Sequence, residues 1–249
     1  MTLTDDSPRV IVVIQARLGS TRYPRKVLMP LRGATVLEHI YRRCQSSRMA
    51  KEVIVACPPT DSEVIFSTTG ILPYEGPEED VLTRLIGAGK KKMADFLVRV
   101  TADCPLVDPK MIDEMAELAL KRITPIVTNT YTRTWPDGMD LEVYDFEWMQ
   151  NLDEWIKPIA DRGDFYMWCL ERLPPRTFTQ LQSARSLNHY RLTLDYAEDM
   201  DVISEVYKAQ RGAIWFTDTI VKFLDHNPRI ARINAMHAKK NQGEGRSCS

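Results

Sequence analysis

Seven residues with phosphate-binding chemistry lie close together in the segment QARLGSTRYPRK, residues 15–26. They comprise four cations, one glycine and two hydroxyl residues: Arg17, Gly19, Ser20, Thr21, Arg22, Arg25 and Lys26. Glycine lets a backbone approach a ligand closely, and hydroxyl and amide hydrogens bind phosphate oxygens. Each charge-assisted hydrogen bond contributes about 1.5–3 kcal/mol, so three of them outweigh the cost of ordering the loop. The segment therefore predicts a phosphate-binding loop, with a solvated basic loop as the alternative; it contains neither a Walker motif nor a G-x-G-x-x-G motif.

Two separated aspartates each follow an expected strand. Asp103 lies in RVTADCPLVDP, residues 99–109, and Asp195 lies in RLTLDYAED, residues 191–199. Mg²⁺ takes one or two protein carboxylates and completes its shell with phosphates and water. If both strands join one sheet, the two carboxylates converge on one magnesium ion. The structural alternatives are a turn cap at Asp103, and an N-cap at Asp195 with Glu198 completing a capping box.

A third acidic group occurs in the sequence WPDGMDLEV, residues 135–143. The Asp-Gly turn followed by alternating acidic and apolar residues predicts a short strand with Asp137, Asp140 and Glu142 on one face. Such carboxylates could bind hydroxyl or amino groups of a substrate. A solvated edge strand is the equal alternative.

Alternating strands and helices are expected to position these groups. We predict strands at residues 10–14, 52–56, 96–100, 125–128 and 191–194, and helices on the apolar stripes Leu37/Ile40/Tyr41/Cys44, Val81/Leu82/Leu85/Ile86, Ile112/Met115/Ala116/Ala119 and Met200/Ile203/Tyr207. Asp108 is the expected N-cap of the third helix, with Pro109 in its first position. This order predicts a doubly wound α/β fold with a mostly parallel sheet, in which ligands bind at the carboxyl ends of the strands.

Composition limits the classes of partner. The chain has 249 residues, 44% of them hydrophobic, and a net charge of −1. No overall field attracts it to nucleic acid or to anionic lipid, so we expect neither as a partner. The sequence MTLTDDSPR is not typical of a signal peptide, and no apolar run reaches membrane-spanning length, so a cytoplasmic location is expected.

The domain prediction is a single domain over residues 9–237, with flexible tails at 1–8 and 238–249. The regular pattern weakens over residues 133–185, which we interpret as an acceptor-binding or dimerisation subregion. Within it, residues 146–173 are rich in aromatic residues and methionine, which favours a homodimer contact over a substrate lid. The five cysteines, Cys44, Cys57, Cys104, Cys169 and Cys248, have no metal-finger spacing and are expected to be reduced, and Cys104 has no neighbouring base to make it a nucleophile.

Four stretches resemble a known family in the family's own order: IQARLGSTRYPRKVL, VRVTADCPLVDP, DGMDLEV and RLTLDYAEDMDVI. They are similar to the cytidylyltransferases of the acylneuraminate and CMP-Kdo synthetase type, and most similar to the spore-coat polysaccharide branch. The resemblance implies a nucleotide-binding α/β fold and a Mg²⁺-dependent transfer of CMP from CTP to a small acidic sugar. Pyrophosphate is released, and the product enters surface polysaccharide or glycoconjugate synthesis.

The resemblance also implies roles for individual residues. The CTP-binding residues would be Ala16, Arg17, Leu18, Gly19, Ser20, Thr21, Arg22, Lys26, Cys57, Pro58 and Thr101. Arg17, Arg22 and Lys26 would contact the phosphates as catalytic residues, Asp103 and Asp195 would bind Mg²⁺, and Cys57, Pro58 and Thr101 would lie near cytosine. Acceptor binding is assigned to Asp137, Asp140, Glu142 and Arg191. Arg25 stands where the family usually has glycine, so the turn there is expected to differ.

Two other functions remain open. A glycosyltransferase that uses a nucleotide-sugar has a related fold, but such enzymes typically hold their metal with a D-x-D pair, whereas TADCP supplies one aspartate. A non-catalytic protein could bind the nucleotide without turning it over. The sequence also leaves the acceptor open among nonulosonic acids, octulosonic acids and smaller phosphonate-like molecules.

Overall fold

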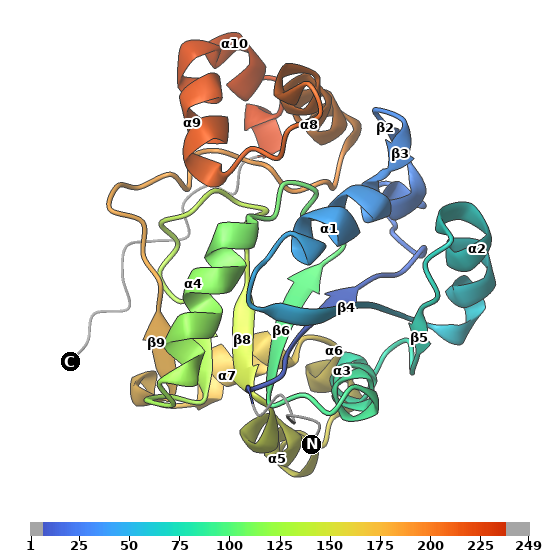
Figure 1. Cartoon of the computed structure of the whole chain (residues 1–249), viewed down its shortest axis with the longest axis vertical. Helices are drawn as coiled ribbons and strands as arrows, with labels where there is room; N and C mark the ends of the chain where they lie inside the picture. Colours follow the sequence, from blue (N-terminus) through green and yellow to red (C-terminus); the bar gives the residue numbers. More distant parts are fainter. Residues whose placement is uncertain (1–6, 238–249) are drawn as a thin grey trace, which may run out of the picture.

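A seven-stranded sheet lies at the centre of the computed structural model, which describes residues 7–237, in the order β5-β4-β1-β6-β8-β7-β9 (Figure 1). The strands are β1 (Val10–Gln15), β4 (Ala50–Cys57), β5 (Tyr74–Glu75), β6 (Phe96–Thr101), β7 (Ile126–Thr128), β8 (Glu142–Asp145) and β9 (Phe178–Gln180), and a separate small hairpin pairs β2 (Pro30–Leu31) with β3 (Ala34–Thr35). Strands β5, β4, β1 and β6 are parallel. Strand β8 runs antiparallel to both β6 and β7, and β7 is parallel to β9. The predicted α/β class with a mostly parallel sheet is confirmed.

Strand β1 is buried on both faces, as its continuous β-branched run predicts. Val10, Val12 and Ile14 belong to the core on one side of the sheet, while Ile11 and Val13 belong to the core on the other. This division follows the two-residue period of a strand. Helices cover both sides of β1, so its carboxyl end is the natural place for a ligand.

Ten α-helices within residues 7–237 form the layers around the sheet: α1 (Val36–Gln45), α2 (Pro59–Thr69), α3 (Val81–Lys91), α4 (Pro109–Leu120), α5 (Phe146–Trp155), α6 (Ile159–Gly163), α7 (Phe165–Arg172), α8 (Ala197–Gln210), α9 (Thr217–His226) and α10 (Pro228–Ala231). Short 3-10 turns occupy Lys26–Leu28, Pro175–Thr177 and Ala235–His237. The core on one face includes residues of α1, α4, α8 and α9, and the core on the other includes residues of α3, α5 and α7. Helices α8, α9 and α10 gather at one end of the molecule (Figure 1).

The predicted helices agree with the observed ones. Thr35 caps α1 with a capping box, and Asp108 accepts a hydrogen bond from the Lys110 N–H at the start of α4, with Pro109 in the first helical position. Residues 146–173, whose sequence pattern does not predict individual elements, fold as helices α5 to α7. Cys44, Cys57, Cys104 and Cys169 are buried and unpaired, as expected, whereas Cys248 lies outside the described residues.

Two predicted strands are wrong. The segment at residues 191–194 does not join the sheet and forms only an isolated bridge between Arg191 and Asp137. Its N–H groups bond to loop carbonyls, because Leu192 N donates to Asp137 O at 2.6 Å and Leu194 N donates to Asp103 O at 2.8 Å. The acidic segment from Asp137 is also not a strand before Glu142, where β8 begins.

A close approach of two loops explains the second difference. Gly138 has a φ of 97°, and a Cβ at this position would lie 2.2 Å from the Thr193 nitrogen. Only glycine fits both the backbone conformation and this distance. Asp137 and Asp140 therefore belong to a tight turn against residues 191–194, and they do not share a strand face with Glu142.

The predicted tails, 1–8 and 238–249, lie outside the described residues except for Ser7 and Pro8. Within residues 7–237, every helix is too short or too polar to cross a bilayer.

Candidate active site

The basic loop after β1 is held in a compact shape by backbone contacts at both of its ends. Ala16 N extends the β1 ladder by donating to Ala56 O at 3.0 Å, and Arg25 N closes the loop by donating to Leu18 O at 3.2 Å. Asp61, in the first turn of α2, accepts a hydrogen bond from Leu18 N at 2.8 Å. The loop is therefore positioned by the sheet on one side and by α2 on the other.

Arg25 has a left-handed backbone, with φ 56° and ψ 21°. A side chain costs about 1–2 kcal/mol in this conformation, which glycine adopts freely. Arg25 therefore occupies a backbone conformation that favours glycine, and it does so at some cost in strain.

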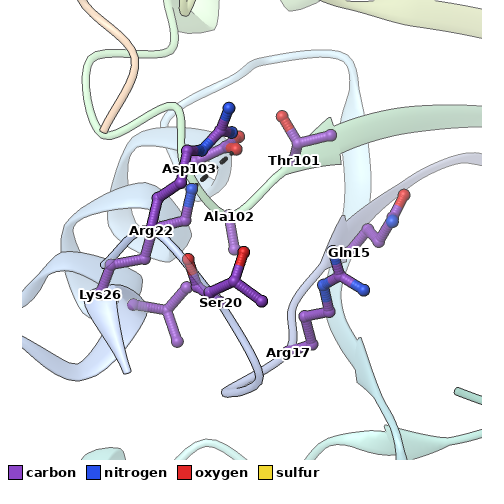
Figure 2. Close-up of a pocket in the computed structure, with 10 residues that line it drawn as sticks. Gln15, Arg17, Ser20, Arg22, Lys26, Thr101, Ala102 and Asp103 are labelled. Carbon is purple, nitrogen blue, oxygen red and sulfur yellow. Dashed lines mark hydrogen bonds and ion pairs between the residues drawn. The ribbon is translucent and has the colours of Figure 1, made fainter. Parts of the chain in front are cut away.

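A cavity of about 290 Å³ opens beside this loop at the carboxyl ends of β1 and β6 (Figure 2). Its walls are Gln15, Arg17, Ser20, Thr21, Arg22, Lys26, Val27, Thr101, Ala102 and Asp103. Seven of these residues carry sequence-based assignments, and they come from two segments about 80 positions apart in the chain. The predicted meeting of the basic loop with Asp103 at one sheet edge is therefore observed.

Lys26 joins the two predicted metal-binding carboxylates. Its Nζ donates to Asp103 Oδ2 at 3.0 Å and to Asp195 Oδ1 at 2.9 Å. Burial by itself would lower the pKa of Lys26, but the two carboxylates outweigh this effect and raise the pKa above its ordinary value. Asp103 and Asp195 therefore converge on the Nζ atom of Lys26, although Asp195 lies on a loop and not at the end of a strand.

Asp195 is surrounded by cations. Besides Lys26, it accepts from Arg22 Nη2 at 2.8 Å and from Arg191 Nη2 at 3.2 Å. Burial by itself would raise the pKa of Asp195, but these partners hold it below its ordinary range. Asp195 is only 9% exposed, so it is an ionised carboxylate in a sheltered position.

Asp199, not Glu198, caps helix α8. Asp199 Oδ2 accepts from the N–H groups of Asp195 and Tyr196 at 2.8 and 2.9 Å. The same carboxylate binds Arg191 through Nε and Nη2 at 2.8 and 2.9 Å, and it is fully buried. The expected capping box is thus built one residue later than the sequence pattern indicated, and it fixes the position of Asp195.

Asp103 and Asp195 fit a magnesium ion whose remaining ligands are phosphate oxygens and water. Within residues 7–237, no group of three or more His, Cys, Asp or Glu side chains could hold a metal ion by itself. Two carboxylates that converge beside a cavity lined by cations match the incomplete protein shell that Mg²⁺ commonly uses. Asp103, with 30% of its side chain exposed, is the more accessible of the two.

Some predicted nucleotide-binding residues do not line the cavity. Ala16 is buried beneath the loop, and Leu18 and Gly19 lie in it without facing the cavity. Cys57 and Pro58 are buried at the end of β4, and burial raises the pKa of the Cys57 thiol to about 12. Their side chains contribute to packing here, and their assignment to cytosine stays a prediction.

The four residues assigned to acceptor binding are all engaged in ion pairs. Arg191 is held by Asp137 at 3.0 Å in addition to Asp195 and Asp199. Glu142 is 3% exposed and accepts from Arg99 Nη1 at 2.8 Å. Asp140 pairs with Arg133 at 3.0 Å, yet burial raises its pKa to about 6. Asp140 is therefore the most available of these carboxylates for proton transfer near neutral pH.

The thiol of Cys104 is not suited to act as a nucleophile, in spite of its position beside Asp103. It is buried, and burial raises the pKa of its thiol well above the ordinary value. A thiol that stays protonated is a poor nucleophile.

Comparison with known proteins settles the family. The family model described as Cytidylyltransferase matches residues 11–146, which is more than half of the chain. The chain belongs to the cytidylyltransferase family. It is therefore a nucleotidyltransferase enzyme, and the predicted resemblance is confirmed.

Two relatives of this cytidylyltransferase have informative names. The spore coat polysaccharide biosynthesis protein SpsF of Bacillus subtilis is 26% identical over 89% of this chain and 96% of its own length. The 3-deoxy-manno-octulosonate cytidylyltransferase of Geobacter sulfurreducens is 31% identical over 50% of this chain and 48% of its own length.

Solved structures agree with the fold. A cytidylyltransferase from Leptospira borgpetersenii has a TM-score of 0.85 and 27% identity, covering 96% of this chain and 100% of its own. A CMP:2-keto-3-deoxy-manno-octonic acid synthetase in complex with CTP has a TM-score of 0.62 and 16% identity, covering 81% of this chain and 99% of its own. The cavity therefore lies in a fold that this chain shares with cytidylyltransferases.

Sequence reasoning missed several residues that build this site. Gln15, Val27 and Ala102 line the cavity, and Asp61 and Asp199 position its loops. Gln15 carried a signal, since it is the polar residue that ends β1 directly before the basic loop. Asp61 and Asp199 act through contacts between distant segments or through backbone N–H groups, which residue types alone do not reveal.

Proposed function

We propose that this cytidylyltransferase transfers CMP from CTP to a hydroxyl group of a small acidic sugar and releases pyrophosphate. The observation that carries the proposal is the bridge from Lys26 to both Asp103 and Asp195 beside the cavity that Arg17 and Arg22 line. A metal-bound triphosphate needs this combination of cations and carboxylates in one place. The name of the octulosonate-activating relative supports an acidic sugar, and the name of SpsF supports a role in surface polysaccharide synthesis.

The residues around the cavity would act mainly by position and charge. Arg17, Arg22 and Lys26 would bind the nonbridging oxygens of the triphosphate and offset the charge that develops as pyrophosphate departs. Ser20 and Thr21 would donate hydrogen bonds to the same phosphates. The acceptor hydroxyl attacks the α-phosphorus opposite the departing pyrophosphate, and no covalent intermediate with the protein is required.

Mg²⁺ is part of the proposal. Asp103 and Asp195 would hold it, and when bound it neutralises phosphate charge and polarises the phosphoryl group. Lys26 now donates to both carboxylates, so its ammonium would turn toward the phosphates when the ligand enters. Asp195 would keep its other cationic partners, Arg22 and Arg191, during this exchange.

The acceptor would bind near the turn at residues 137–140. Asp140 is the candidate base for the acceptor hydroxyl, because a carboxyl pKa near the working pH suits proton transfer. Glu142 is less suited to this role, because it is buried against Arg99. The identity of the acid, nonulosonic or octulosonic, is left to the assay.

Three further parts of the proposal concern organisation. Residues 9–237 are proposed to act as one domain, and the protein is proposed to be located in the cytoplasm.

A homodimer is proposed through the surface around α5 to α7, where Trp155, Ile159 and Met167 are 46%, 52% and 45% exposed. Light scattering behind size-exclusion chromatography measures the mass directly, and Trp155→Glu is expected to shift a dimer to monomer.

The test of the function is an assay of pyrophosphate release. The protein is incubated with CTP and Mg²⁺ and with single acids, including 3-deoxy-manno-octulosonate and N-acetylneuraminate, and with UTP in place of CTP. Acid-dependent pyrophosphate release with CTP supports the proposal. A parallel incubation contains a nucleotide-sugar in place of CTP, and release of its sugar supports a glycosyltransferase. Tight CTP binding without product from any acid supports a non-catalytic binding protein.

A further inference from the structure

The amide of Gln15 is oriented by an arginine. Arg99 Nε on β6 donates to Gln15 Oε1 at 3.0 Å. Because a guanidinium has only donors, the amide oxygen has to face Arg99, which leaves the NH₂ end turned away from it. Within residues 7–237, this NH₂ group has no hydrogen-bond partner, and Gln15 lines the cavity. The cavity therefore has a neutral donor of fixed orientation in its wall.

A buried ion pair fixes Arg99 in turn. Arg99 and Glu142 are direct partners in the antiparallel register of β6 and β8, and Arg99 Nη1 donates to Glu142 Oε2 at 2.8 Å. The two side chains are only 12% and 5% exposed. Such a pair has little freedom, so Arg99 orients Gln15 before any ligand arrives, which lowers the ordering cost of binding.

The cavity has two chemically different sides. Figure 2 shows Lys26, Arg22 and Asp103 together on one side, and Gln15 and Arg17 on the other. The first side fits phosphates. On the second side the cation Arg17 can also reach a phosphate oxygen, whereas the amide of Gln15 and the hydroxyl of its register neighbour Thr101 suit neutral acceptor atoms. A cavity of about 290 Å³ lies just below the ~300–1,000 Å³ typical of small-molecule sites, so it has room for one ligand at most. If phosphates bind beside Lys26, the group beside Gln15 would be another part of the same molecule.

We propose that Gln15 is a specificity-determining residue, whose NH₂ group donates a hydrogen bond to a neutral acceptor atom on the base or ribose of the bound nucleotide. Arg99 and Glu142 are positioning residues that orient the amide. This inference rests on the proposed nucleotide-binding function and adds a residue that recognises the part of the nucleotide beyond its phosphates.

Two probes separate the nucleoside from the phosphates. Isothermal titration measures the binding of CTP and of inorganic tripolyphosphate, each with Mg²⁺, to the wild type, Gln15→Met and Lys26→Met. Gln15→Met keeps the length of the side chain and removes the donor, so it is expected to weaken CTP binding about three- to tenfold and to leave tripolyphosphate binding unchanged. Lys26→Met is the matched control and is expected to weaken the binding of both probes.

Three results would overturn the inference. Unchanged CTP affinity in Gln15→Met would show that the amide does not contact the nucleoside. An equal loss for CTP and tripolyphosphate would place Gln15 at the phosphates. A wild type that binds neither probe would overturn the proposed nucleotide-binding function as well, which distinguishes that failure from the first two.

A second pair of variants tests the positioning role. Glu142→Gln removes the charge that holds Arg99, and Glu142→Asp keeps it. We expect Glu142→Gln to lower the ratio of CTP affinity to tripolyphosphate affinity about threefold or more, with Glu142→Asp closer to the wild type. A loss of stability with an unchanged ratio would show that the ion pair only packs the fold and would overturn the positioning role.

Discussion

Arg191 and Asp199 form a bidentate ion pair in the interior, with Nε to Oδ1 at 2.8 Å and Nη2 to Oδ2 at 2.9 Å. Asp199 is 0% exposed and also receives the Nδ2 group of Asn234 at 2.9 Å. The pair ties the loop that carries Asp195 to the start of α8 and to the segment after α10. The position of a candidate metal ligand therefore depends on contacts that are far from any ligand.

The first prediction concerns this pair. Asp199→Asn removes the bidentate partner of the buried Arg191 guanidinium, which keeps only Asp137 and Asp195 as counter-charges, so we expect the free energy of unfolding to fall by about 1.5–3 kcal/mol. Urea denaturation followed by circular dichroism measures the change. Asp201→Asn on the exposed side of α8 is the matched control, and a change within about 0.5 kcal/mol is expected there. Equal effects of the two substitutions would contradict the structural role of Asp199.

The second prediction concerns turnover. Asp103→Asn removes an accessible carboxylate at the cavity wall and is expected to lower kcat by about 10²–10³-fold while the fold is retained. Glu117→Gln on the exposed side of α4 should leave the rate unchanged. Pyrophosphate release gives the rate, and circular dichroism reports the fold. Near-normal turnover in Asp103→Asn would refute its assignment to Mg²⁺.

Metal removal gives the third prediction. Since the described fold contains no protein-only metal cluster, EDTA is expected to abolish pyrophosphate release without lowering the thermal unfolding temperature. Adding Mg²⁺ in excess should restore the rate. Turnover that continues at full rate in EDTA would exclude a dissociable divalent ion from the reaction.

The fourth prediction is a pH dependence of stability. Burial raises the pKa of Asp140 from 3.8 to about 6, so between these values the folded state binds more protons than the unfolded state. The free energy of unfolding is therefore expected to decrease as the pH rises from about 4 to 6, with Asp140 contributing up to about 3 kcal/mol. Asp140→Asn should flatten the curve over this range. Parallel curves for the wild type and the variant would contradict the assignment.

The fifth prediction concerns the strained turn. Arg25→Gly relieves a left-handed backbone and is expected to raise the free energy of unfolding by about 0.5–1 kcal/mol. Arg42→Gly, inside helix α1, is the contrasting control and should lower it by about 1 kcal/mol. Thermal and urea unfolding give both values. If Arg25→Gly also raises the Michaelis constant for CTP, the arginine contacts the phosphates as well.

Local patterns predicted the elements that carry strong periodicity. The β-branched run of β1 and the apolar stripes of α1, α3 and α4 each meet a sheet that buries them, so propensity and packing agree there. The basic loop and Asp103 were also predictable, because the carboxyl ends of parallel strands lie at one edge.

The route of the chain to Asp195 was not predictable from local sequence. Residues 191–194 alternate in a way that is typical of a strand, but their hydrogen bonds go to Asp103 O and Asp137 O on two different loops. The partners that make Asp199 a cap and Arg191 its counter-ion are likewise fixed by tertiary contacts. Residue types show that such groups can pair, and only the fold decides which of them meet.

The separation of Lys26 from Asp195 by 169 positions has a consequence for synthesis of the protein. A nascent chain presents its basic loop and Asp103 outside the ribosome well before Asp195 has been translated. During that interval Lys26 has one of its two carboxylate partners, and the helices that hold the second are still missing. Formation of the ion pair between Lys26 and Asp195 is therefore a late event in biogenesis, because it requires the segment that begins at Arg191.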